Sequence, residues 1–90
     1  MENFEEIKGD VKNIYKLSVR YGNCQSFYGK AHIIVTDKGQ YLKSYDTIVA
    51  KIENNKPTVF GWYSSTTGRH INEFLQQNGF NKMTKKEMEA

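Results

Sequence analysis

One stretch of the chain, residues 62–80, constrains the fold more than any other because it contains the signals of a complete helix. Four consecutive hydroxyl residues, 64–67, are N-cap candidates, since Ser and Thr oxygens accept hydrogen bonds from the first free amides of a helix. Ile71, Phe74 and Leu75 then recur at the spacing of one helical face. We expect the polar residues between them to face solvent: Asn72, Glu73, Gln76 and Gln77.

The end of this helix is marked as clearly as its beginning. Gly79 suits the left-handed conformation that commonly follows the last helical turn. With Gly79 in that position, Phe80 and Leu75 become the pair that makes the hydrophobic contact of a Schellman ending. We therefore predict a helix over residues 65–79.

The segments before this helix alternate in the manner of β-strands and lack a helical period. In residues 11–21, for example, Tyr15, Leu17 and Val19 share one face. Four more segments lie between turns that contain Gly, Asn or Asp: residues 25–36, 40–44, 45–53 and 58–63. We therefore predict four or five consecutive strands.

Two details of these strands follow from the residue types. Ile48, Ala50 and Ile52 are spaced to share one face of a strand. Ser44 and Asp46 precede Ile48 at the alternate positions that would share its face, but both are polar. We therefore expect the chain to bend or bulge near Tyr45. Pro57 lacks an amide donor and is expected just outside the last strand.

This order of elements predicts an α+β fold, an antiparallel four- to five-stranded meander with one C-terminal helix packed on one face. Ninety residues make a single domain, 1–90, in which residues 1–10 form an N-terminal arm and residues 11–63 the sheet. A lone helix covers only one face of a sheet. We therefore expect the other face to be open and to contact a partner.

The charged tail, residues 81–90, contains the signals of a second, short helix. Thr84 and Glu87 have the spacing of a capping box, and Met83 and Met88 stand at the positions of a hydrophobic staple. So short a helix is not stable alone. We expect it either to dock on the body or to fray.

Composition excludes several classes of protein. No apolar run approaches the roughly 20 residues that cross a membrane, and no signal-peptide pattern is present. The single cysteine, Cys24, excludes an internal disulfide and suits a reducing compartment, so we expect a cytoplasmic location. The net charge of +3 is uneven, because residues 1–10 are acidic and residues 11–81 are basic. A mildly basic body favours nucleic acid or an acidic protein face, but it also simply aids solubility.

The start of the predicted helix is the sharpest candidate for a binding site. Free amides, the hydroxyls of residues 64–67 and the cation of Arg69 are suited to hold a phosphate or carboxylate. In the alternative, the hydroxyl residues only cap the helix and Arg69 pairs with Glu73. His70 then only packs its ring against Phe74.

A second candidate lies on the predicted sheet. Tyr28, Lys30 and His32 share one strand face, with Lys16 or Arg20 as cross-strand neighbours. Interleaved rings and cations on a sheet are one way in which proteins stack single-stranded bases. The alternative is an ordinary solvated sheet face, and no RNP-like motif is present.

The sequence does not favour an enzyme. A nucleophile needs a partnered base, and Cys24 has no His at a recognisable spacing. His32 and His70 with one Cys form no zinc pattern, and no Gly-rich phosphate loop is present. We therefore expect no catalytic residue, metal or cofactor.

Two segments, residues 42–52 and 61–74, resemble a small family of uncharacterised domains found in bacteriophages, plasmids and other mobile elements, mainly of Firmicutes. The first match has the pattern Ser-Tyr-x-Thr-x-Val-x-x-Ile: Ser44, Tyr45, Thr47, Val49 and Ile52. The second has the pattern Ser-x-Thr-Thr-x-Arg-His-Ile: Ser64, Thr66, Thr67, Arg69, His70 and Ile71. The resemblance implies no established activity or cofactor. It implies an accessory role, such as anti-CRISPR inhibition of host defence or nucleic-acid binding.

These observations lead to three expected functions. The first is a non-enzymatic phage or mobile-element protein that inhibits a host defence effector, anti-CRISPR-like, by contact with that protein or its guide-RNA complex. The second is a DNA- or RNA-binding accessory protein, and the third is a homo-oligomeric structural protein, such as a homodimer. The predicted binding residues are Lys16, Arg20, Tyr28, Lys30, His32, Tyr45, Ser65, Thr66, Thr67, Arg69 and His70.

Overall fold

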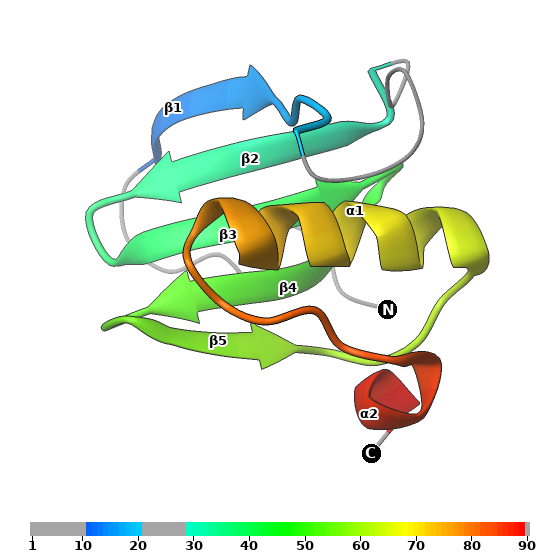
Figure 1. Ribbon diagram of the computed structural model, residues 1–90. Coiled ribbons are helices and arrows are strands. Elements are labelled where there is room, and N and C mark those ends of the chain that lie inside the picture. The colour runs from blue at the N-terminus through cyan, green and yellow to red at the C-terminus, as the bar shows by residue number, and fades with distance from the viewer. Residues whose placement is uncertain (1–10, 21–28, 90) are drawn as a thin grey trace.

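The computed structural model describes residues 11–20 and 29–89, which form one antiparallel sheet and two helices (Figure 1). The strands lie side by side in chain order: β1 (Val11–Lys16), β2 (Ala31–Thr36), β3 (Gly39–Ser44), β4 (Thr47–Glu53) and β5 (Lys56–Val59). The helices are α1 (Ser65–Gln77) and α2 (Lys85–Glu89). The predicted α+β meander with a C-terminal helix is confirmed. The predictions for the N-terminal arm, Cys24 and Tyr28 lie outside the described residues.

Short turns set the register of the central strands. Between β4 and β5, Asn54 and Asn55 have φ values of 54° and 62°, the positive values that a type I′ hairpin requires at both central residues. Between β2 and β3, the hydroxyl oxygen of Thr36 accepts hydrogen bonds from the amides of Lys38 and Gly39. A Cβ atom on Gly39 would lie 2.2 Å from the Ile52 carbonyl oxygen, so the hairpin needs glycine there.

The third turn confirms the break that was expected near Tyr45. Tyr45 has a φ of 56° and turns the chain from β3 into the separate strand β4. The register of this strand pair shifts between Leu42 and Lys43, which is a β-bulge. Because of the bulge, Ile48 pairs with Lys43 on one face, whereas Ala50 pairs with Leu42 on the other. The prediction that Ile48, Ala50 and Ile52 share a face was therefore wrong for Ile48.

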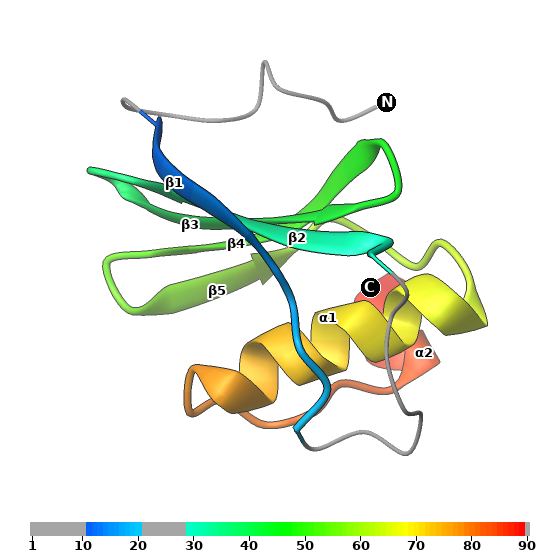
Figure 2. The same cartoon turned by 90° about the horizontal axis from the view of Figure 1, so that it is seen from above.

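The main core lies between α1 and the sheet. Figure 2 shows both helices on the same side of the sheet. Ile71, Phe74 and Leu75 of α1 are at most 1% exposed, which confirms the predicted helical face. They pack in one cluster with residues of the strands and flanking segments: Leu17, Ala31, Ile33, Leu42, Val49, Ala50, Ile52 and Met88.

The opposite face of the sheet is not open at its centre. Ile34, Tyr41 and Ile48 form a second cluster there and are 0–1% exposed, with Phe60 packed against them. These apolar side chains lie on the same face of β2, β3 and β4, and Ile48 joins them because of the bulge. Their burial is favourable because it removes apolar surface from water. The expectation of an open face was therefore wrong for the middle of the sheet.

Both ends of α1 have the predicted chemistry. Ser64 is the N-cap, and its hydroxyl oxygen accepts a hydrogen bond from the Thr67 amide at 3.1 Å. At the other end, the amide of Phe80 donates to the carbonyl of Leu75 at 2.9 Å, and Gly79 has a φ of 85°. These are the features of the predicted Schellman ending. The helix itself ends at Gln77, two residues before the predicted boundary.

The tail docks on the body rather than fraying. The Thr84 amide donates to Glu87 Oε1 at 2.7 Å, and the Glu87 amide donates to Thr84 Oγ1 at 3.2 Å, so the predicted capping box is present. Met88 is 2% exposed and belongs to the main core, and the partly buried Met83 packs against that core. The two methionines thus anchor α2.

The strand boundaries differ from the predictions in β1, β2 and β5: β2 begins at Ala31 rather than at residue 25, and β5 ends at Val59 rather than at residue 63. Strand β1 ends at Lys16, after which the chain crosses to α1 and places Leu17 in the main core (Figure 2). Pro57 lies inside β5 and not before it. A proline is tolerated there because β5 is an edge strand and needs amide donors on one side only.

Candidate functional site

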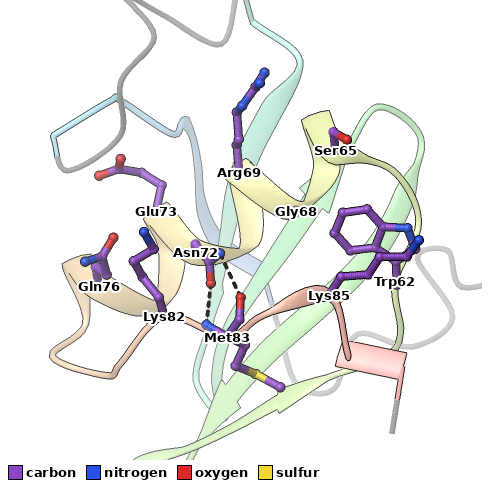
Figure 3. A pocket seen from close by; sticks show the side chains of 10 residues that line it. All are labelled: Trp62, Ser65, Gly68, Arg69, Asn72, Glu73, Gln76, Lys82, Met83 and Lys85. Carbon is purple, nitrogen blue, oxygen red and sulfur yellow. Dashed lines mark hydrogen bonds between the residues drawn. The ribbon is translucent and has the colours of Figure 1, made fainter. Parts of the chain in front are cut away.

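A hollow of about 340 Å³ lies on the side of α1 that faces away from the sheet (Figure 3). We call it the helix groove. One wall is the exposed side of α1, and the other is the chain from residue 82 to residue 85 together with Trp62. The lining residues are Trp62, Ser65, Gly68, Arg69, Asn72, Glu73, Gln76, Lys82, Met83 and Lys85.

Two local contacts hold the walls of the helix groove in place. The side-chain amide of Asn72 donates to the Met83 carbonyl at 3.0 Å and accepts from the Met83 amide at 2.8 Å. The Trp62 ring lies against Gly68 so closely that a Cβ atom there would be 2.7 Å from Cζ3 of the ring. Glycine at position 68 therefore allows the indole to pack on the helix backbone. Lys85 Nζ lies 5.5 Å from the ring centre, within the range of a cation–π contact.

The charge of the helix groove is positive. Arg69, Lys82 and Lys85 are exposed, and within the described part of the chain none of them has an ion-pair partner. The one acidic residue in the lining, Glu73, is 2% exposed. Its Oε2 atom accepts hydrogen bonds from the Arg20 amide at 2.9 Å and from Gln77 Nε2 at 2.6 Å.

The placement of Glu73 corrects two predictions. Its side chain was expected in solvent, but it is buried because it fastens the segment after β1 to α1. Asn72, Gln76 and Gln77 are likewise half-buried rather than fully solvated. No ion pair joins Arg69 to Glu73 among the described residues, and Figure 3 shows Arg69 pointing away from it.

A second basic site lies on the opposite face of the sheet, at one end of strands β1 to β3. Lys16, His32 and Lys43 are register partners across these strands, so their side chains share one face. A hollow of about 300 Å³ adjoins them, lined by Gly29, Lys30, His32, Lys43, Tyr45 and Asp46. We call Lys16, Lys30, His32 and Lys43 the basic cluster.

The structure places one predicted pair side by side and adds a residue, whereas Tyr28, the ring predicted for this face, lies outside the described residues. Lys16 is the cross-strand neighbour of His32, as expected, whereas Arg20 lies beside α1 and does not join them. Lys43 was missed, because the predicted 37–39 loop would bring Ser44 opposite His32, whereas β3 begins at Gly39 and pairs Lys43 with His32. Tyr45 borders the hollow and is 48% exposed. Nδ1 of His32 is buried and has no hydrogen-bond partner within the described ranges.

Two predicted binding residues belong instead to a buried polar network. Ser44 Oγ lies 2.8 Å from His70 Nδ1 and 2.9 Å from Thr67 Oγ1. His70 is 0% exposed, and desolvation by burial lowers its pKa from 6.5 to about 4, so the ring is neutral. The Tyr45 ring centre lies 6.0 Å from that of His70. These contacts tie α1 to the end of β3 and leave the predicted binding residues Thr67 and His70 only 4% and 0% exposed.

The remaining predicted residues near the start of α1 are divided between these sites. Ser65 lines the helix groove beside Arg69, whereas Thr66 lines neither hollow and is partly buried. The sequence did not identify Trp62, which packs on Gly68, or Lys82 and Lys85, which border the groove because the tail docks on the body. The described residues contain no group of His, Cys, Asp and Glu that could hold a metal ion. No helix of the described part is long and apolar enough to span a membrane.

Comparison with known proteins places the chain in a family. The model of a family of unknown function, DUF8033, matches residues 15–90. This match covers most of the chain, so the protein belongs to that family. No curated protein and no solved structure matches the chain.

Proposed function

We propose that this member of the DUF8033 family is a non-enzymatic accessory protein that binds single-stranded nucleic acid through the basic cluster. The proposal is based on the strand register, which pairs Lys16 with His32 and His32 with Lys43. These three basic side chains therefore form one row across β1, β2 and β3. Adjacent strands lie about 4.8 Å apart, so the row forms a compact basic surface. Lys30 extends it at the rim of the neighbouring hollow.

Tyr45 supplies the second element of such a site. Proteins that bind single strands combine cations that follow the phosphates with exposed rings on which bases stack. The Tyr45 ring is 48% exposed and borders the same hollow as Lys30 and His32. Its position is fixed because it occupies a tight turn whose amide donates to the Lys30 carbonyl at 2.7 Å.

Binding of fluorescently labelled single-stranded DNA and RNA, measured by anisotropy at several salt concentrations, tests the proposal. Replacing both Lys16 and Lys30 with serine is expected to weaken binding about tenfold and to reduce the salt slope by about 1.4, since each phosphate contact with a single strand contributes about 0.7. The matched control replaces the exposed Lys56 and Lys86 with serine, which removes the same charge elsewhere. Equal losses in both double variants would refute a localised site.

A third variant separates stacking from charge. Tyr45→Asn keeps a residue type that tolerates the positive φ of the turn but removes the ring. We expect it to weaken binding about tenfold while the salt slope stays unchanged, because a base stacked on a ring contributes about 1–3 kcal/mol. The exposed Tyr15, replaced in the same way, is the control.

We propose inhibition of a host defence effector, anti-CRISPR-like, as a second candidate function. The open sheet face no longer supports it, but the edge strand β1 does. Val11, Ile14 and Tyr15 are 47–52% exposed there, the largest exposed apolar group on a single described strand. Affinity capture from a host lysate, with and without nuclease, distinguishes the two functions. Retention of an effector after nuclease treatment favours inhibition, and its loss favours nucleic-acid binding.

The exposed edge strand also supports the third expected function, self-association. Multi-angle light scattering of the purified chain measures its mass directly. A dimer that dissociates in an Ile14→Lys variant would place the contact on β1. A monomer at all concentrations would remove this function.

A further inference from the structure

We propose that the helix groove is a binding site for a small phosphorylated molecule, held by Arg69, Lys82 and Lys85 against Trp62. This site lies on the helix side of the sheet and shares no residue with the basic cluster. The inference therefore stands independently of nucleic-acid binding by the sheet.

The three cations come from separate parts of the chain. Arg69 lies on α1, Lys82 on the connecting segment and Lys85 at the start of α2, and all three line one hollow. Three like charges around one hollow give it a positive potential that attracts an anion. Glu73 offsets one of them, and its buried carboxylate already accepts hydrogen bonds from the Arg20 amide and from Gln77. A ligand that carries two negative charges balances the remaining positive charge of the groove.

The residue types favour phosphate. The guanidinium group of Arg69 presents paired donors that match phosphate oxygens, and the lysines act as compact charges beside it. The volume of about 340 Å³ is at the lower end of the range of about 300–1,000 Å³ for small-molecule sites. This space suits a compact phosphorylated molecule, and the half-buried indole of Trp62 provides an apolar wall for a ring or carbon chain.

The groove is also organised in advance. Two hydrogen bonds between Asn72 and Met83 fix the distance between its walls, and Met88 anchors the far side in the core. Little chain entropy is therefore lost on binding. The cations keep the freedom of exposed side chains and can close on the ligand.

Trp62 gives a direct measurement, because it is the only tryptophan of the chain and lines the groove. Its emission is followed during titration with inorganic phosphate, pyrophosphate and adenosine monophosphate, at constant ionic strength. The indole is excited at the red edge of its absorption, where adenine does not absorb. We expect a saturable change with micromolar to millimolar affinity for at least one of these probes. If adenosine monophosphate binds more tightly than pyrophosphate, the natural ligand is a nucleoside phosphate. If pyrophosphate binds more tightly, the natural ligand is a phosphorylated molecule without a base.

Two double variants decide where the probe binds. Arg69→Gln with Lys82→Gln is expected to weaken the tightest probe about tenfold or more. Lys38→Gln with Lys86→Gln is the matched control, because it removes the same charge from exposed positions outside the groove. Thermal unfolding of each free variant verifies that the fold is kept.

Three outcomes overturn the inference: no saturable change of emission with any probe, equal weakening in both double variants, or a phosphate response that sodium chloride reproduces. The Lys16 and Lys30 double variant keeps the phosphate response if the two sites are separate. Loss of nucleic-acid binding in that variant with an intact Trp62 response would support both proposals. Loss of the Trp62 response there would overturn the placement in the helix groove.

Discussion

The buried histidine of α1 makes folding stability depend on pH in a window that the structure defines. His70 is 0% exposed, and burial lowers its pKa from 6.5 to about 4. In the unfolded chain the imidazole takes up a proton near pH 6.5, whereas in the folded protein it stays neutral down to about pH 4. Between these values the unfolded state holds more protons. Acid therefore favours unfolding, and stability falls as the pH falls.

The size of the effect follows from the two pKa values. With 6.5 for the unfolded state and about 4 for the folded state, the contribution of His70 at about pH 5 is a loss of about 2 kcal/mol relative to neutral pH. The full difference, reached below about pH 4, is about 3 kcal/mol. Either value is a large part of the roughly 5–15 kcal/mol that stabilises a domain.

Urea unfolding at a series of pH values measures this contribution, with His70→Asn as the comparison. The Asn side-chain amide reaches the position of Nδ1 and can keep the hydrogen bond to Ser44, but it does not titrate. We expect the wild type to lose about 2 kcal/mol more than the variant between about pH 7.5 and about pH 5. Parallel losses in the two proteins over this window would refute the assignment of a neutral, desolvated imidazole.

Three substitutions test the packing that shapes the helix groove and its support. Gly68→Ala forces the Trp62 ring off the helix, because the added carbon would lie 2.7 Å from the ring. We expect it to lower the free energy of unfolding by about 1–3 kcal/mol and to shift Trp62 emission, and unchanged emission would contradict the close packing. Gly79→Ala meets no neighbour within 4 Å but must adopt a φ of 85°, so urea unfolding should show a smaller loss of about 1 kcal/mol, and no loss would argue against the left-handed helix ending. Met88→Ala removes a side chain that is 2% exposed and is expected to cost about 2–5 kcal/mol in thermal or urea unfolding; a loss near zero would show that α2 does not dock.

The features that could be predicted from the sequence are those that a few neighbouring residues determine. The Ser64 region, Gly79 and the Thr84–Glu87 box each set a helix end by hydrogen bonds within one turn, and all three are present. The hairpin between β2 and β3 is set locally as well, although its loop is one residue shorter than predicted because Gly39 belongs to β3. Strand order also followed, because short turns between strands leave few alternatives to a meander.

The features that could not be predicted depend on residues distant in the chain. Glu73 is buried because the backbone of Arg20, which is 53 positions away, donates to it. Ile48 lies on the opposite face of the sheet from Ala50, because a single bulge reverses the alternation of side chains for the residues of β4 that precede it. The helix groove depends on the docking of α2, which the tail sequence left open. The sequence thus identified Arg69 as a candidate but not the cavity that it lines.

The strict chain order of the strands has a consequence for how the protein reaches its native state. Each strand of the described sheet pairs only with the strands that precede or follow it, and the hairpins from β2 to β5 each close only a short loop, whereas residues 17–30 connect β1 to β2. Topologies dominated by such near-neighbour pairings pass their transition state quickly, and mixed α/β domains of this kind commonly fold faster than β-sandwiches of the same size. The β3–β4 hairpin is the natural nucleus, since its inner residues supply both apolar clusters at once. A stopped-flow experiment should therefore show substitutions at Leu42 slowing folding more than they speed unfolding.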